Sequence, residues 1–209
     1  MAFCDGNGGG DVITLGAGND IVLLSTLSAG GALNATATSA TVTDFVVGTT
    51  ATATDTYTVN VTAIDPLLFG GVGGTLTNAA GTSLIAAPTN ASFVSVNAGQ
   101  VTSIAASTAN IVKIIGSTNA TAGNTAQQGF VAALNGGTVT LNNAFNNTDR
   151  ILVTYYDSAN GQAVLGAVDA NANTQNTIDA ADNFTVLVRT TMSSADFTNF
   201  GNVNFGAFV

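Results

Sequence analysis

The chain has 209 residues, of which 46% are hydrophobic and only 7% charged, and twelve acidic against three basic residues give a net charge of −9. The three scattered cations, Lys113, Arg150 and Arg189, cannot neutralise a run of phosphates, which excludes nucleic acid as a partner. The absence of His and the single thiol, Cys4, exclude His-based catalysis, ordinary zinc sites and an intramolecular disulfide. We therefore expect a protein that is not an enzyme.

Composition also predicts the fold class. Pro occurs only twice, Gly occurs 24 times, and β-branched residues are plentiful, which favours many short strands joined by tight turns. No run of eighteen apolar residues is present, so we expect no membrane span. All acidic residues are Asp, whose short side chain suits turns and the coordination of hard cations such as Ca²⁺. A mainly β protein with calcium as its cofactor is the expectation.

The first predicted element is a repeat of nine residues. Residues 6–14 align with residues 15–23, and each copy has a Gly-x-Asp turn followed by a short β-branched strand. Glycines allow positive φ in such turns, and the carboxylates and turn carbonyls are oxygen ligands of the kind that calcium prefers. A single motif would indicate an ordinary solvated turn, whereas two in register favour a calcium site. The predicted ligand positions are Asn7, Gly9, Asp11, Gly18, Asn19 and Asp20.

This nonapeptide pattern resembles the calcium-binding repeats of the RTX (repeats-in-toxin) family. The resemblance implies the end of a parallel β-roll or β-helix, in which strand residues stack in the core and calcium binds between the turns. Two repeats form about one coil, and stable arrays usually need at least three. We therefore expect residues 1–24 to end a longer array.

After a loop rich in Gly, Ala and Thr, residues 40–48 and 55–61 predict two strands across a polar turn. Their Asp-Phe-x-x-Gly and Asp-x-apolar sequences resemble the segment that follows the repeats in type I secreted proteins. We assign residues 25–64 to roll-capping strands. Residues 65–149 form a further β-rich segment, with strands near 93–96 and 111–115 and one short helix near 125–134 that ends at an Asn-Gly pair.

Residues 150–209 show the clearest strand alternation. Residues 151–156 and 162–168 predict a hairpin, residues 184–189 a further strand, and residues 193–197 a short capped turn. Tyr155 and Tyr156 are expected on opposite faces of their strand. With its apolar terminus, this series resembles the uncleaved export signal of RTX and surface-layer proteins.

A second, weaker metal candidate lies between these strands. Asp169, Asn171, Asn173 and Asp179 resemble the start of a helix-loop-helix calcium loop, whose oxygen ligands fall at alternate positions. Thr174 stands where that loop needs Gly, and Ala180 stands where it needs a closing Glu. A polar hairpin connection is the preferred interpretation.

The resemblance implies a non-catalytic carboxyl-terminal module of a calcium-dependent bacterial surface protein, most like a surface-layer protein. Its implied partners are the type I secretion machinery and other copies of itself, and its implied location is extracellular. Two alternatives stay open. In the first, the chain is the non-catalytic tail of a secreted hydrolase or toxin. In the second, it is an adhesive or carbohydrate-binding module, and the absence of Trp disfavours this second alternative.

Overall fold

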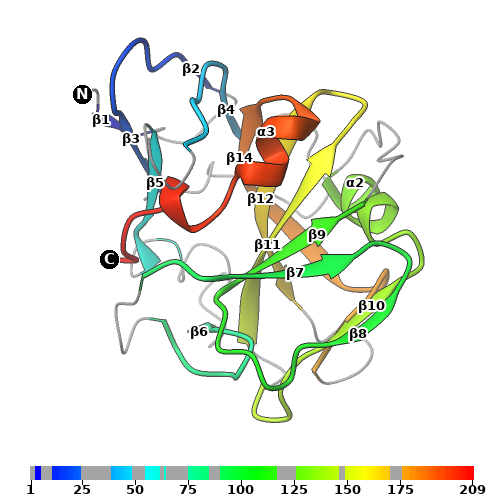
Figure 1. The fold of residues 1–209 in the computed structure, drawn as a ribbon. Coiled ribbons are helices and arrows are strands. Elements are labelled where there is room, and N and C mark those ends of the chain that lie inside the picture. Colours follow the sequence, from blue (N-terminus) through cyan, green and yellow to red (C-terminus); the bar gives the residue numbers. More distant parts are fainter. Residues whose placement is uncertain are drawn as a thin grey trace.

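The computed structural model describes residues 3–5, 11–24, 39–48, 55–61, 64, 75–84, 90–116, 126–145, 149–169 and 176–209. The described residues form a mainly β protein (Figure 1), as the composition predicts. The strands are β1 (Phe3–Asp5), β2 (Val12–Ile13), β3 (Ile21–Leu24), β4 (Ala40–Val42), β5 (Thr56–Val59), β6 (Thr75–Leu76), β7 (Phe93–Asn97), β8 (Val101–Ser103), β9 (Ile111–Ile115), β10 (Thr138–Thr140), β11 (Asp149–Asp157), β12 (Gln162–Asp169), β13 (Thr177–Ile178) and β14 (Asn183–Thr191). The helices are α2 (Ala126–Leu134), α3 (Ser194–Asn199) and the 3₁₀ helix η1 (Asn202–Asn204).

A mixed eight-stranded sheet organises the fold, in the order β2-β4-β14-β12-β11-β9-β7, with β6 paired to β11. Its centre is the antiparallel hairpin β11–β12, which pairs Ile151 with Val168 and Asp157 with Gln162, so the predicted hairpin is confirmed. The predicted strands near 93–96, 111–115 and 184–189 are confirmed as β7, β9 and β14. The sheet takes strands from all four predicted parts of the chain, whose boundaries stay a prediction.

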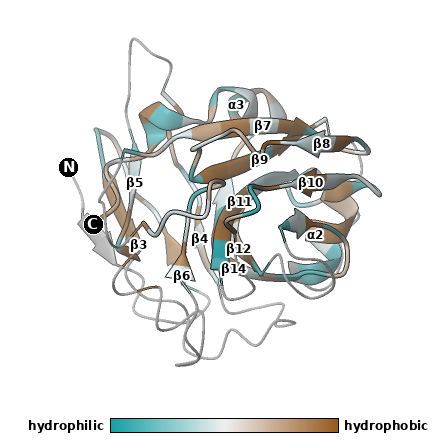
Figure 2. Cartoon of the chain, turned by 90° about the horizontal axis from the view of Figure 1, so that it is seen from below, coloured by the Kyte–Doolittle hydropathy of each residue, from teal (hydrophilic) through white to brown (hydrophobic). Residues whose placement is uncertain are grey.

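The two faces of this sheet pack against different layers (Figure 2). Because successive residues of a strand point to opposite faces, Leu152 belongs to one hydrophobic core and its neighbour Val153 to another. The first core joins the sheet to β3, β5 and the carboxyl-terminal residues. The second core joins it to α2 and to the small sheet β13-β10-β8.

The predicted helix is confirmed as α2. Phe130, Ala133 and Leu134 are buried, and Phe130 stacks on Phe184 of β14 with ring centroids 5.0 Å apart. The helix ends at Asn135 and Gly136, which both adopt positive φ, as an Asn-Gly stop requires. Of the two tyrosines, Tyr155 is buried and Tyr156 is half-buried, which agrees with their predicted opposite faces.

The amino-terminal strands alternate between two sheets. β1, β3 and β5 form a parallel three-stranded sheet, while β2 pairs in parallel with β4 and joins the eight-stranded sheet. β4 and β5 therefore do not pair with each other, although the Asp55 amide donates to the Val46 carbonyl at 3.3 Å. We call β1 to β5 and their described turns, residues 3–61, the parallel-strand region.

Candidate functional site

The two predicted repeat aspartates lie at the starts of strands in different sheets. Asp11 precedes β2, and its side chain is exposed while its carbonyl accepts a hydrogen bond from the Thr41 amide at 2.7 Å. Asp20 precedes β3 and is 1% exposed. Equivalent positions of the repeat therefore occupy very different environments, because β3 lies between two strands and β2 forms an edge.

Asp20 stacks on Asp55, which occupies the same position before β5. The Asp20 amide donates to Oδ1 of Asp55 at 2.9 Å, and the Thr56 amide donates to the Asp20 carbonyl at 2.9 Å. The second carboxylate oxygen of Asp55 accepts from the Val46 amide at 2.7 Å. Asp55 is fully buried, and its carboxylate ties the start of β3 to the segment that follows β4.

Asp44 closes the turn between β2 and β3 in a similar way. Its two carboxylate oxygens accept from the amides of Leu15, at 2.7 Å, and Gly16, at 2.8 Å, where Gly16 has a φ of +83°. These two hydrogen bonds hold the pKa of Asp44 below its ordinary value of 3.8. Asp44 and Asp55 belong to the motifs in residues 40–48 and 55–61, but they are not among the ligand positions predicted from the sequence.

The remaining repeat candidates are placed only in part. Gly18 and Asn19 are exposed in the turn before Asp20, and Gly18 adopts a φ of +133°. Asn7 and Gly9 lie outside the described residues. Within the described part of the chain, no group of three or more Asp, Glu, His or Cys side chains gathers as a metal site would require. The calcium assignment therefore stays a prediction.

The weaker candidates after β12 lie apart from that region. Asp169 ends β12, and its Oδ2 lies 2.5 Å from Nη2 of Arg150 in an ion pair. Asp179 accepts from the Ala181 amide at 2.8 Å, and its own amide donates to Asp182, which together shape a tight turn before β14. Asn171 and Asn173 lie outside the described residues. The described contacts of Asp169 and Asp179 are those of a strand connection.

The carboxyl-terminal tail, residues 201–209, pairs with the open side of β5 (Figure 1). The Gly206 amide donates to the Tyr57 carbonyl at 2.8 Å, and the Val209 amide donates to the Val59 carbonyl at 3.0 Å. Phe205 and Phe208 are buried in the first core, where Phe205 contacts Tyr57 at a centroid distance of 5.6 Å. The segment that resembles an export signal thus completes the sheet formed by β1, β3 and β5.

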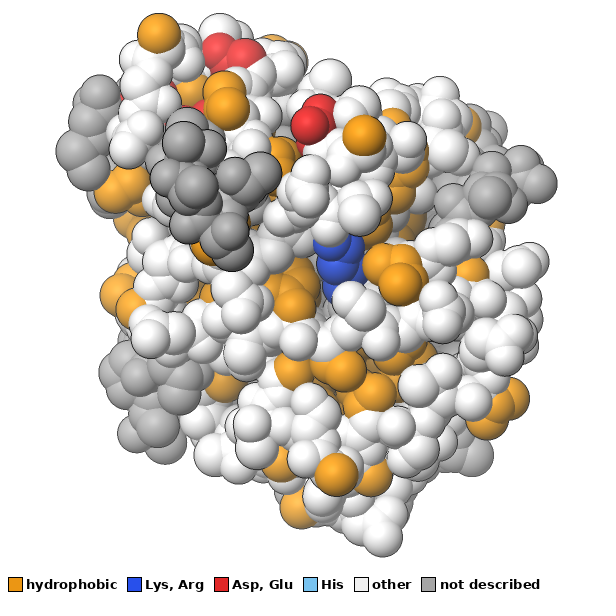
Figure 3. Space-filling model, in the orientation of Figure 1, with side chains coloured by type: hydrophobic (Ala, Val, Ile, Leu, Met, Phe, Trp, Pro, Cys, Tyr) orange, Lys and Arg blue, Asp and Glu red, His pale blue; other side chains and the backbone are white. Residues whose placement is uncertain are grey.

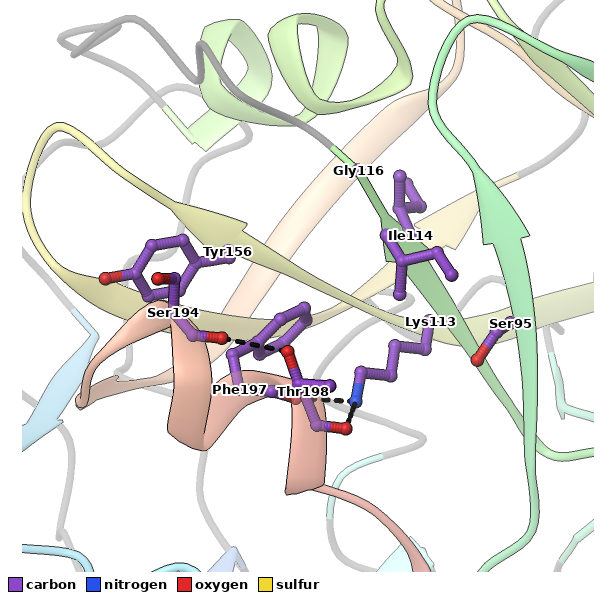
Figure 4. Close-up of a pocket in the computed structure, with 9 residues that line it drawn as sticks. Ser95, Lys113, Ile114, Gly116, Tyr156, Ser194, Phe197 and Thr198 are labelled. Carbon is purple, nitrogen blue, oxygen red and sulfur yellow. Dashed lines mark hydrogen bonds between the residues drawn. The ribbon is translucent and has the colours of Figure 1, made fainter.

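Helix α3 precedes this tail and is fastened at both ends. Ser193 and Asp196 form a capping box at its start, so the predicted capped turn is a short helix. At its end, Nζ of Lys113 donates to the carbonyls of Phe197 and Thr198 at 2.6 and 3.1 Å (Figure 4). It also donates to the carbonyl of Phe200 at 2.7 Å. Burial lowers the pKa of Lys113 to about 8. Lys113 therefore anchors the end of α3 to β9.

A cleft of about 370 Å³ lies beside α3, bordered by Ser95, Tyr156, Phe197, Thr198 and residues 113–116 (Figure 4). Its walls are mainly apolar. An ammonium has three donors, and Nζ of Lys113 lies within hydrogen-bond distance of three carbonyls at the α3 end, so these carbonyls account for all of its donors. The cleft follows from the packing of α3 beside β9, and we assign no ligand to it.

Comparisons of the chain with protein-family models, with curated proteins and with solved structures found no match. Neither α2 nor α3 is long and apolar enough to cross a membrane. The resemblance to RTX and surface-layer proteins therefore depends on the sequence motifs alone.

Proposed function

We propose that this chain is the non-catalytic carboxyl-terminal module of a secreted, calcium-dependent bacterial surface protein, and that it serves type I export and assembly at the cell surface. The observation that carries the proposal is the stack of Asp20 on Asp55, two buried carboxylates at equivalent positions of neighbouring strands. Buried carboxylates are costly unless cations or hydrogen bonds compensate them. Backbone amides compensate the Asp55 carboxylate, whereas no Lys or Arg precedes Lys113 in the chain to neutralise Asp20.

The charge distribution along the chain supports a bound cation. Six of the twelve Asp residues precede Lys113, and no Lys or Arg occurs before it. Figure 3 agrees, because acidic side chains on that face gather over the amino-terminal strands and α3, away from the basic side chain in the central hollow. A divalent cation with oxygen ligands would reduce the repulsion among these carboxylates.

The strand pairing supports the β-roll reading of this region. Strands alternate between the β1-β3-β5 sheet and the β2-β4 pair, with parallel neighbours in both. The calcium ligands in this proposal are Asp11, Gly18, Asn19 and Asp20, together with Asn7 and Gly9. Asp44 and Asp55 have a different role, because their carboxylates already bind backbone amides and close the last coil.

Calcium dependence would couple folding to location. In a cytosol with little free calcium, repulsion among the carboxylates keeps the amino-terminal strands unfolded, which suits passage through a type I exporter. Outside the cell, calcium binds only the folded arrangement and therefore stabilises it by mass action. The tail that resembles the export signal is buried against β5 only in the folded chain.

A calcium titration of the purified chain tests the proposal directly. We expect calcium to raise the β-sheet signal in circular dichroism and the melting temperature, while magnesium at the same concentration has a smaller effect. Asp20→Asn should weaken the apparent calcium affinity at least tenfold. Asp157→Asn is the matched control, since it also removes a buried carboxylate but lies outside the parallel-strand region. Identical melting in calcium and in chelator would contradict the proposal.

Asp55→Asn separates the structural aspartates from the calcium ligands. An amide keeps one acceptor oxygen, so one of the two hydrogen bonds to the Asp20 and Val46 amides is lost. We expect a stability loss of about 1–3 kcal/mol, typical of an unsatisfied buried group. Amide exchange at Asp20 and Val46, followed by NMR, measures the effect. Unchanged protection of both amides would show that Asp55 does not tie the coils together.

Export and assembly need their own measurements. In a host that carries a type I exporter, the full chain should reach the medium, and deletion of residues 205–209 should reduce that yield. Electron microscopy of the purified chain should show ordered arrays with calcium and none with chelator. Calcium-bound monomers without arrays would favour the tail of a secreted hydrolase or toxin instead.

A further inference from the structure

Strand β7 forms one edge of the eight-stranded sheet, and its outward backbone groups can be identified. β7 pairs in parallel with β9, and the ladder begins with the Ile111 amide donating to the Ser92 carbonyl and ends with the Ala98 amide donating to the Ile115 carbonyl. Backbone groups of alternate residues point in opposite directions across a strand. The even-numbered residues therefore face β9, and Phe93, Ser95 and Asn97 face outward.

These outward groups are available for pairing. Within the described residues, the N–H and C=O groups of Phe93 and Ser95 form no hydrogen bond, while the Asn97 carbonyl accepts only a long turn bond of 3.3 Å from the Gln100 amide. The Ser95 and Asn97 side chains are exposed. An edge with free backbone groups is a template for another strand.

The β7 edge lacks the features with which proteins usually protect such edges. Charged side chains, proline and bulges discourage pairing, yet residues 90–100 contain neither charge nor Pro. The opposite edge of the same sheet is different, because β2 has only two residues and is flanked by Asp11 and faced by Asp44. Figure 3 shows the face over β7 and β9 as hydrophobic and uncharged around one basic side chain in the central hollow, with the acidic side chains toward the top of the view.

We propose that β7 pairs antiparallel with β7 of a second copy of this chain, around a two-fold axis between the two Ser95 residues. In this register each Ser95 exchanges two backbone hydrogen bonds with its symmetry mate, and Phe93 pairs with Asn97 on both sides of the axis. An isologous contact of this kind needs a self-complementary strand, and the outward positions meet that requirement. The sheet would then continue through both molecules.

Charge favours a second copy over another partner. The chain has a net charge of −9, so most of its surfaces repel a second copy, but β7 brings no carboxylate to the axis. The cation opposite Ser95 on β9, Lys113, already donates to three carbonyls at the end of α3, so a charged peptide would gain no ion pair along β7. Val101 of β8, which follows β7 after a tight turn, is 82% exposed and adds apolar area beside the edge. This contact specifies one interface of the proposed surface assembly and so rests on the proposed function, but it requires no calcium in the contact itself.

Ser95→Pro tests the pairing at its centre. Proline removes the outward N–H of residue 95 without removing a bond to β9, which an edge strand tolerates. With calcium present, we expect sedimentation equilibrium to detect dimers of the wild type and of Ser95→Ala, and to give Ser95→Pro a dissociation constant at least tenfold higher. Ser95→Lys, which places two cations at the axis, should act in the same direction if the proline variant does not fold. A monomeric wild type, or a folded Ser95→Pro or Ser95→Lys variant that dimerises normally, would overturn the proposal.

Cysteine cross-linking tests the register. In a Cys4→Ser background, Ser95→Cys places two thiols across the axis at a Cα separation of about 5.5 Å, within the range that a disulfide spans. Asn97→Cys is the matched control, because its symmetry mate lies four residues further along, about 14 Å away. Mild oxidation should link the Ser95→Cys chains into dimers and leave the Asn97→Cys chains unlinked. Equal cross-linking of both, or of neither, would refute this register.

Discussion

The parallel-strand region and the β7–β14 part of the sheet are held together by different forces. Strands β1 to β5 have two to four residues each, and the turns between them are closed by carboxylate–amide bonds from Asp44 and Asp55. Strands β11 and β14 have nine residues, and their core contains stacked aromatic rings such as Phe130 on Phe184. Short strands bury little apolar area, so the turns must contribute the stability that packing supplies elsewhere.

The carboxyl-terminal residues connect these two regions. Phe200 contacts Phe45 and Tyr57 of the parallel-strand region, at centroid distances of 5.9 and 6.2 Å, while its carbonyl accepts from Lys113 of β9. Tyr57 in turn shares a 2.6 Å hydrogen bond with Thr190 of β14. The parallel-strand region is therefore completed by side chains from the last residues of the chain, whereas the β7–β14 part has a core largely of its own.

The largest loss of stability is expected from a substitution in the second hydrophobic core, in the β7–β14 part of the sheet. Phe184→Ala removes the ring that stacks on Phe130 and contacts Tyr155, leaving a cavity in the second core. We expect a loss of about 3–5 kcal/mol in the free energy of unfolding, measured by urea denaturation. Phe184→Leu should lose clearly less. If packing dominates in the β7–β14 part, the loss in the free energy of unfolding will be the same at low and high calcium. A calcium-dependent loss would show that the two regions are not stabilised independently.

A smaller loss of stability is expected at the end of α3, where Lys113 of β9 holds the carboxyl-terminal residues that connect the two regions. Lys113→Met keeps the apolar stem but removes the three hydrogen bonds to the end of α3. We expect amide exchange over residues 197–200 to become at least tenfold faster, which corresponds to about 1.4 kcal/mol of local stability. Lys113→Arg, which keeps the charge, should restore part of the protection. Exchange equal to the wild type in Lys113→Met would mean that packing alone holds α3.

The smallest effect is expected for Asp44 in the parallel-strand region, where a carboxylate–amide contact contributes stability that depends on pH. The folded-state pKa of Asp44 lies below 3.8, so its carboxylate contributes stability that is fully present above pH 3.8 and is lost as pH falls through the lowered value. Asp44→Asn should therefore be less stable than the wild type at neutral pH, by no more than about 1.5 kcal/mol. The difference should shrink with acidification, as chemical denaturation at several pH values can measure. A constant difference would exclude the carboxylate as its source.

Local sequence patterns determined most of the element types. The β11–β12 hairpin follows from two runs of strand-forming residues around an Asn-Gly turn, and α2 follows from its spaced apolar residues and its Asn-Gly end. Both depend on interactions between residues close in the chain, which is why they could be predicted. The repeat also placed strands after Asp11 and Asp20, because a Gly-x-Asp turn acts on its own neighbours.

Only the tertiary structure decided how these elements meet. The burial of Asp20 and the exposure of Asp11 depend on which strand has neighbours on both sides, and equal motifs cannot encode that difference. The roles of Asp44 and Asp55 required amides 28 to 35 residues away in sequence, and the pairing of the tail with β5 required contacts across most of the chain. Such long-range contacts form because they bury aromatic side chains and satisfy backbone groups at the same time. Both gains depend on which segments pack together in the folded chain, and no local pattern specifies that.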